Sequence, residues 1–246
     1  MIEVDLIDNM GTDLSVVNAA RASFSKKSEW AGFHGGGTDD PYLKEKDSKL
    51  IRYLGEHKHY SPFGHCFLSF AIYCPIFVQA QLLKHKFLRA NSESRRYIST
   101  DPEFYEPTHW RGKPKDKKQG SEGELDLYVD QQLLWYRQLQ TYKMLLEEGV
   151  APEMARMVLP QSMMVNFVWS GSLDAFADMY KLRTSGDAQK ETRIVASQIG
   201  VYASYLYPES WSALTKDPNI QFSATHYMSE ESIATRAVME KINNGR

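Results

Sequence analysis

The stretch from residue 66 to residue 97 constrains the fold most, because it places a predicted strand directly before a predicted helix. Residues 66–74, CFLSFAIYC, are rich in aromatic and β-branched side chains, which is typical of a strand. Pro75 fits the first turn of a helix, and the apolar run after it predicts a helix to about Phe87. A short polar loop follows. A chain with this segment therefore combines sheet and helix in one unit.

Helical spacing also dominates the rest of the chain. Helices are predicted at residues 13–22 with an Asp or Ser start, 47–57, 123–149, 151–159, 172–183 with Ser172 as cap, and 187–207 with Asp187 as cap and Pro208 as stop. In the longest helix, Leu133, Tyr136, Leu139 and Leu146 are predicted to face a core. Residues 1–6 predict a strand, and residues 31–40 and 98–123 predict loops. With no repeat or linker, we predict one helix-rich α+β domain over residues 1–246.

Composition limits the classes of function. Of 246 residues, 42% are hydrophobic and 24% are charged, as in an ordinary globular protein. A net charge of -2 favours neither nucleic acid nor a membrane surface as partner. Residues 1–15 carry acids where a signal peptide has basic residues, and residues 66–83 are too short and too polar to span a bilayer. We expect a cytoplasmic protein, or one of the host cytoplasm if the source is a virus.

The two cysteines, Cys66 and Cys74, are too few for a disulfide scaffold. On one extended strand they would lie about 26 Å apart, which is too far for a disulfide. Nothing basic surrounds Cys66 to activate its thiol. We expect both to belong to the core. No metal site is predicted.

A basic tripeptide, Lys84-His85-Lys86, ends the predicted helix, with Gln81 one turn before His85. Cations at a helix C-terminus can simply complement the helix dipole. The loop after it offers hydroxyl, amide and guanidinium donors at Asn91, Ser92, Ser94 and Arg96. Such donors suit a nucleotide phosphate, although a surface turn has the same composition. On these residues alone, structural and functional interpretations stay open.

Two arginines further along the chain are further candidates for binding an anion. Arg156 lies in a short apolar helix, MARMVL, where a solvated charge is unexpected. Arg183 ends one predicted helix just before the next, where it can be a partner of the helix dipole. Both can clamp a phosphate or carbonyl group bidentately.

Taken in order, these segments resemble the flavin-dependent thymidylate synthase family. They read S-P-F-x-H, K-H-K-x7-S-x-R-Y, A-R-x-V-L-P and L-R-x4-A-Q, and VVNAARASF precedes them. The family's Arg-His-Arg, followed after seven residues by Ser, is matched by Lys84-His85-Lys86 and Ser94. The likeness extends over roughly residues 12–200. We identify the chain as a divergent member, which implies an α+β fold with an antiparallel sheet.

The resemblance implies conversion of dUMP to dTMP with methylenetetrahydrofolate as carbon donor. Reduced FAD would supply the hydride, NADPH would reduce the flavin, and no enzyme cysteine would attack the pyrimidine. Arg183 would be the catalytic residue, stabilising negative charge on the ring. The resemblance assigns FAD contacts to Lys84, His85, Lys86, Ser61, His59, Ser92, Ser172 and Asp178, and dUMP contacts to Gln81, Ser94, Arg95, Arg96, Arg156 and Arg183. It also implies a homotetramer with shared active sites.

Several positions depart from the family pattern. Lysines replace its two arginines, Ser92 replaces an acid, with Glu93 one place later, and Gly64 replaces the Glu of its S/T-P-F-E-H motif. Asp174 and Asp178 bring acids to positions that are usually neutral or basic. These changes leave two alternatives: another C5 modification, such as hydroxymethylation or use of dCMP, and an inactive nucleotide-binding homologue.

Overall fold

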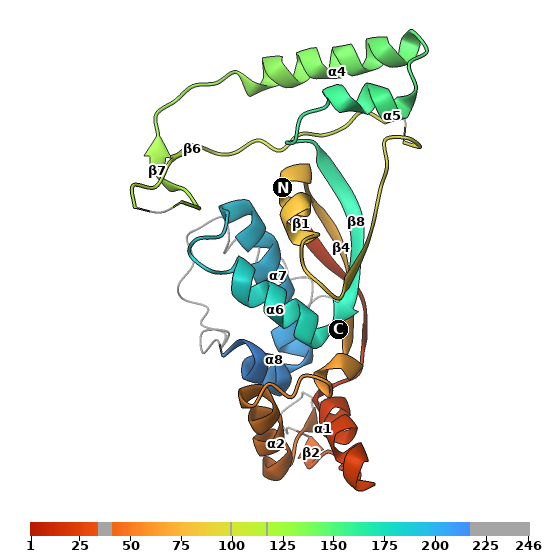
Figure 1. The fold of residues 1–246 in the computed structure, drawn as a ribbon, viewed down its shortest axis with the longest axis vertical. Coiled ribbons are helices and arrows are strands. Elements are labelled where there is room, and N and C mark those ends of the chain that lie inside the picture. Colours follow the sequence, from red (N-terminus) through yellow and green to blue (C-terminus); the bar gives the residue numbers. More distant parts are fainter. Residues whose placement is uncertain (34–40, 99, 117, 217–246) are drawn as a thin grey trace.

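A four-stranded antiparallel sheet forms the centre of the molecule in this computed structural model, which describes residues 1–33, 41–98, 100–116 and 118–216 (Figure 1). The strand order is β1-β4-β8-β5. The strands are β1 Glu3–Met10, β4 Phe67–Pro75, β5 Leu88–Ser92 and β8 Met164–Ser172. The predicted α+β class and antiparallel sheet are confirmed. The glycine-rich loop predicted at 31–40 lies mostly outside the described residues.

Helices α6 (Leu173–Arg183) and α7 (Lys190–Leu206) lie along one side of this sheet (Figure 1). Alternate residues of β4 are buried toward them, which is the pattern of a strand covered on one face. The Phe176 ring meets Phe70 and Trp169 edge-on, with ring centroids 5.3 Å apart in both pairs. These contacts join α6 to the two central strands, and they fix where the ends of α6 lie.

Helices α1 (Asp13–Arg21), α2 (Glu45–Glu56) and α8 (Pro208–Thr215) gather at one end of the molecule (Figure 1). The cap of α1 is Thr12, and Asp13 caps a different helix. Its carboxylate accepts the backbone N–H groups of Glu209 and Ser210 at 3.0 and 2.9 Å. Pro208 therefore opens a helix that the sequence did not predict, and Asp13 binds that helix to α1.

The predicted helix to Phe87 is wrong at its end, because α3 covers only Ile76–Leu82. The basic tripeptide lies in turns beyond it, and Phe87 has a φ of 65°, which no helix accommodates. The polar loop expected next begins as strand β5, which pairs with β8 through Leu88 opposite Gly171. Pairing with β8 requires an extended chain from Leu88 onward, so tertiary structure ended the helix early.

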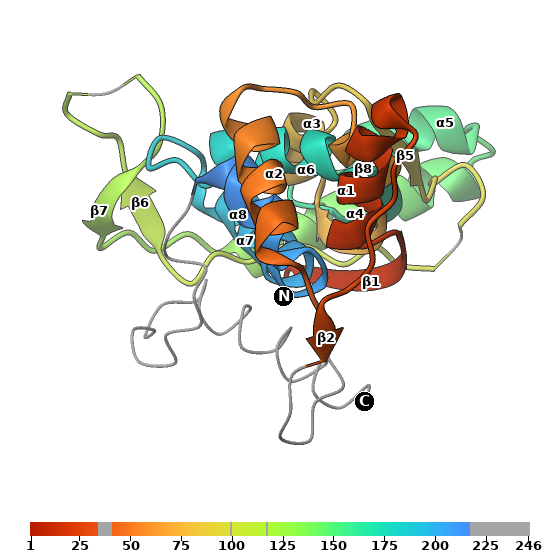
Figure 2. The same cartoon turned by 90° about the horizontal axis from the view of Figure 1, so that it is seen from below.

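The longest predicted helix is also shorter, because α4 covers Gln131–Glu147 and Glu122–Leu125 forms strand β7 against β6 (Trp110–Gly112). Asp130 is the N-cap of α4, and its carboxylate accepts a hydrogen bond from the backbone N–H of Leu133 at 2.9 Å. The prediction of a core face is wrong for Leu133 and Tyr136, which are 43% and 61% exposed. α4 lies beyond one end of the sheet (Figure 1), and β6 and β7 stand at one side of the molecule, away from α1 and β1 (Figure 2).

The remaining elements are short. They are the 3-10 turns Ala22–Phe24, Phe63–His65 and Arg156–Val158, the strands β2 Gly32–Phe33 and β3 Pro41–Tyr42, and helix α5 Pro152–Ala155. The N-cap of α7 is Gln189 and not the predicted Asp187. Within the described ranges, no helix is long and apolar enough to cross a membrane.

Candidate active site

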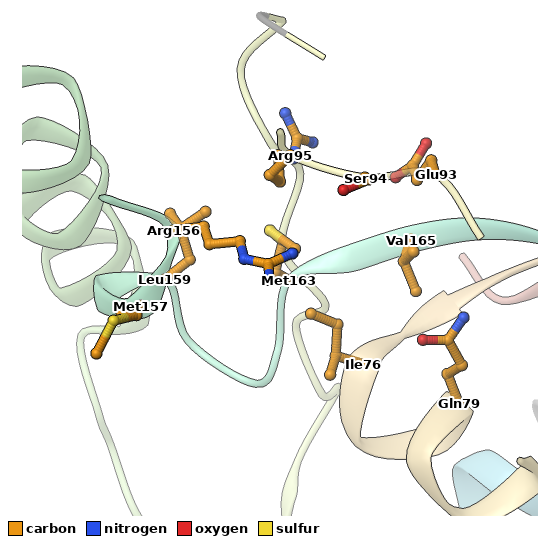
Figure 3. Close-up of a pocket in the computed structure, with 10 residues that line it drawn as sticks. All are labelled: Ile76, Gln79, Glu93, Ser94, Arg95, Arg156, Met157, Leu159, Met163 and Val165. Atoms are coloured by element: carbon orange, nitrogen blue, oxygen red, sulfur yellow. The ribbon is translucent and has the colours of Figure 1, made fainter. Parts of the chain in front are cut away.

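A pocket of about 340 Å³ opens where β8 begins, between α3, the segment after β5 and the Arg156–Val158 turn (Figure 3). Its polar lining residues are Gln79, Glu93, Ser94, Arg95 and Arg156, and its apolar ones are Ile76, Met157, Leu159, Met163 and Val165. We call this the arginine pocket. Three of its residues, Ser94, Arg95 and Arg156, were predicted substrate contacts, and the fold brings them together from two distant segments.

The two arginines of the arginine pocket have unused donors. Arg156 is exposed, and its Nε donates only to the carbonyl of Glu153 in the same turn, at 3.3 Å. Arg95 is 9% exposed and donates to the carbonyl of Thr100, while its buried Nε has no hydrogen-bond partner among the described residues. Since the unpaired Nε–H of Arg95 is buried, the donors that an anion in this pocket can reach are those of Arg156, whose guanidinium extends into it (Figure 3).

Sequence analysis missed Gln79 and Glu93 as pocket residues. Gln79 is buried, and its amide donates to the Ser92 hydroxyl at 2.7 Å. Glu93 accepts from the Asn166 amide at 3.3 Å. A glutamine within an otherwise apolar helix is the signal that could have identified Gln79. Ser92 thus supports the pocket wall through Gln79, whereas the prediction gave it a flavin contact.

Arg183 lies in a second group of polar side chains, between the end of α6 and the end of α3. Its Nε–H donates to Nε2 of His85 at 2.9 Å, and its terminal nitrogen donates to the Gln81 carbonyl at 2.9 Å. The Gln81 amide donates to Gln189 at 2.6 Å and accepts from Thr192 at 3.1 Å. We call these five residues the Arg183 cluster, and three of them were predicted.

Electrostatics in the Arg183 cluster favour a neutral imidazole. Burial and the nearby Arg183 charge lower the pKa of His85 from 6.5, against an opposing effect of Asp178. Burial also lowers the pKa of Arg183 below its ordinary value, although a guanidinium stays charged at neutral pH. Gln189 is the last residue of the L-R-x4-A-Q motif, and the sequence predicts no role for it. It holds the Gln81 side chain.

Apart from Ser92, the residues predicted for flavin fall into two places. Lys84 and Lys86 are exposed, and neither forms an ion pair within the part of the chain that is described. Asp178 lies near His85 and pairs with Lys181 at 2.8 Å. Free lysines fit the negative charges of a flavin pyrophosphate, and Asp178 is bound to a cation of its own. Lys84 and Lys86 therefore offer positive charge beyond the end of α3.

His59, Ser61 and Ser172 lie elsewhere. Ser172 is the N-cap of α6 and pairs with Phe67, while Arg183 ends the same helix of 11 residues, about 16 Å away along its axis. His59 and Ser61 are exposed on the segment that precedes the Phe63–His65 turn, which packs against α6. The fold of one chain therefore separates these three residues from the Arg183 cluster.

Gly64 and Asp174 meet at this N-terminal end of α6. A Cβ at Gly64 would lie 4.0 Å from Oδ1 of Asp174, and that buried oxygen has no hydrogen-bond partner among the described residues. An acidic side chain at position 64 would face another acid there. The glycine and the aspartate are thus compatible with each other.

Arg96 and the two cysteines have local roles. Arg96 is exposed, donates to Ser94 Oγ at 3.4 Å and lies over the Tyr97 ring. Cys66 and Cys74 are free and buried, and burial raises the pKa of both thiols to about 12. Neither cysteine is a thiolate at neutral pH, so neither is set up to attack a substrate.

Comparison with known proteins agrees with this geometry. The family described as thymidylate synthase complementing protein matches residues 5–209. A flavin-dependent thymidylate synthase of Thermus thermophilus is 36% identical over 215 residues, which cover 85% of this chain and 74% of that protein. One from Kosmotoga olearia is 35% identical over 221 residues, covering 85% of this chain and 88% of that protein.

Solved structures give the same result. The UMP/dUMP methylase PolB from Streptomyces cacaoi, bound with 5-Br dUMP, superposes with a TM-score of 0.72 at 30% identity. The match covers 88% of this chain and 95% of that one. The chain belongs to the flavin-dependent thymidylate synthase family.

Proposed function

We propose that this protein methylates C5 of dUMP to give dTMP, with methylenetetrahydrofolate as the carbon donor. The observation that carries the proposal is that two groups of cationic side chains, the arginine pocket and the Arg183 cluster, lie near each other, since both contain residues of α3. Reduced FAD supplies the hydride when bound, and NADPH is the expected reductant of the flavin. The relatives' names support this reaction, and the buried cysteines favour a route without an enzyme thiolate.

The residues divide the work by charge and position. Arg156 and Ser94 would bind the phosphate of the nucleotide, because the exposed Arg156 presents guanidinium donors in one concave site, and Arg95 would add positive charge beside them. Arg183 would stabilise the negative charge that develops on the pyrimidine as C5 becomes nucleophilic. Lys84 and Lys86 would hold the FAD pyrophosphate.

We further propose a homotetramer whose active sites are shared between subunits. His59 and Ser61 precede the turn whose Gly64 lies against Asp174 at the N-terminal end of α6, whereas Arg183 ends the same helix about 16 Å along its axis, so a second chain would have to bring them to it. Helix α4 offers a surface for such contacts, because four of its apolar side chains are between 43% and 61% exposed: Leu133, Leu134, Tyr136 and Met144. Apolar surface of this kind is typical of an interface.

Complementation tests the shared site. His59→Ala and Arg183→Ala are each expected to be inactive, and mixing the two after mild dissociation is expected to restore part of the activity, because some sites receive an intact His59 from one chain and an intact Arg183 from another. Light scattering measures the assembly in the same samples. A tetramer whose mixed variants stay inactive contradicts shared sites.

The reaction is tested by three measurements on one preparation. The purified protein is expected to show flavin absorbance, to release tritium from C5-labelled dUMP, and to yield a product with the mass of dTMP. UMP and dCMP serve as competing substrates, since the solved relative is described as a UMP/dUMP methylase. A hydroxymethylated product, or a colourless protein that takes up no FAD, would overturn the proposal.

A further inference from the structure

We propose that neutral His85 is the positioning residue that aims the Arg183 guanidinium at the pyrimidine, so that protonation of His85 switches the site off. This rests on the proposed function of Arg183. It adds a role for His85 toward the substrate side of the site, separate from its expected contact with FAD. The role depends on which atoms donate and which accept.

The hydrogen bond between the two side chains fixes the protonation of His85. Arg183 has only donors, so Nε2 of His85 must accept the Nε–H at 2.9 Å. The imidazole proton therefore lies on Nδ1, and the ring is neutral. A protonated His85 has no lone pair to offer and would place a second cation against Arg183.

The same bond fixes the direction of the guanidinium. Arg183 is held at two points, Nε on His85 and a terminal nitrogen on the Gln81 carbonyl at 2.9 Å. Two bonds on adjacent edges of a planar group determine its plane, and its remaining N–H groups are directed away from both partners. Loss of the His85 bond leaves one contact about which the guanidinium can turn.

The other side chains of the Arg183 cluster, Gln189 and Thr192, hold Gln81 and do not contact Arg183 through a described hydrogen bond. Gln189 is the N-cap of α7 and Thr192 lies in its first turn, and both bind the side-chain amide of Gln81. Arg183 donates to the backbone carbonyl of the same residue. His85 is thus the one described side chain that receives a hydrogen bond from Arg183.

The charged groups around His85 determine the pH range in which it becomes protonated. Arg183 and Asp178, both from α6, act on it from the packed side, and Asp178 is paired with Lys181. Its chain neighbours Lys84 and Lys86 are exposed. Because burial and Arg183 lower the pKa of His85 from 6.5, the neutral form holds at neutral pH. The hydrogen bond that neutral His85 accepts from Arg183 is fully formed above pH 6.5, and it is lost as pH falls through the lowered pKa of His85.

The test compares His85→Gln with His85→Ala, at saturating FAD, from about pH 5 to pH 8. Glutamine keeps an acceptor where Nε2 lies and cannot titrate, so its dUMP affinity and turnover are expected to lose the acid decline caused by His85. Alanine is expected to lose about tenfold in kcat/KM at about pH 8. The substrate phosphate titrates in all three proteins, so the difference between profiles isolates residue 85. An acid decline in His85→Gln equal to that of the wild type would overturn the inference.

A second measurement does not depend on activity. The pKa of His85, followed by NMR of histidine-labelled holoenzyme, is expected to rise in Arg183→Gln, because a neighbouring cation is removed. Arg193→Gln is the matched control, since among the described residues Arg193 donates only to the backbone carbonyls of Gly186 and Ala188. An unchanged His85 pKa in Arg183→Gln refutes the pairing. A protein that makes no dTMP while this shift occurs refutes the proposed function alone.

Discussion

The arginine pocket and the Arg183 cluster are both cationic, but they hold their arginines in opposite ways. In the pocket, Arg156 is exposed and bonds only its own turn, and the buried Nε of Arg95 has no described partner. In the cluster, Arg183 is bonded to two neighbours before any ligand arrives. The first region can supply binding energy to a phosphate, and the second has already fixed a direction. Binding and catalysis are therefore expected to separate between the two regions.

The largest effect is expected from Arg183→Ala. It removes the only group of the Arg183 cluster that carries a permanent positive charge, so kcat is expected to fall about 10²–10³-fold. Arg183→Lys keeps the charge without the planar fork and is expected to recover little. Turnover at saturating dUMP measures the change. Wild-type turnover in Arg183→Ala would remove its catalytic assignment.

A smaller effect of a different kind is expected from Arg156→Ala. Loss of one charge-assisted phosphate contact is expected to raise the KM for dUMP about 10–100-fold while kcat changes little. Arg52→Ala, an exposed arginine on α2 away from the pocket, is the matched control. If Arg156→Ala lowers kcat and leaves KM unchanged, the division between the two regions is wrong.

The smallest effect is expected from Ser92→Ala, which removes the hydroxyl that accepts from Gln79 at 2.7 Å. Gln79 lines the pocket, so its loss of support is expected to weaken dUMP binding about 2–10-fold. FAD binding is expected to stay unchanged, because Ser92 supports the pocket wall. Flavin fluorescence and dUMP titration of the same samples measure both. A selective loss of FAD would restore the flavin contact that the family pattern implies.

The acid decline of activity described for His85 sharpens the comparison further. The arginine pocket has no described histidine in its lining, so its phosphate contacts do not titrate with an imidazole. A pH effect on turnover that exceeds the effect on phosphate binding would belong to the Arg183 cluster. Measuring inorganic phosphate as a competitor across the same pH range separates the two.

Much of the fold could be predicted where local pattern and tertiary structure agree. Strand β4 and helices α1, α2 and α6 lie within a few residues of their predicted bounds, because their apolar periodicity matches the face that they bury. Strand β8 was not predicted, although its alternation of buried and exposed residues is clear in the structure.

Errors occurred where a distant partner decides the local conformation. The chain after Leu82 has helical composition, yet pairing of Leu88 with Gly171 makes it turn. The α4 helix was predicted to bury Tyr136, which is exposed because no described part of this chain covers it. The helix and strand propensities of single residues cannot predict these contacts, since the contacts join residues far apart in sequence.

The sequence by itself determined the identity of the chemical groups: a basic tripeptide, two arginines in family order, and cysteines placed in a strand core. It did not determine which groups meet. Only the tertiary structure joined Arg183 to His85, placed Gln79 and Glu93 beside Arg156, and moved His59 and Ser61 to the other end of α6. The physical reason is that residue type sets charge and hydrogen-bonding capacity, while strand register and helix length set distance.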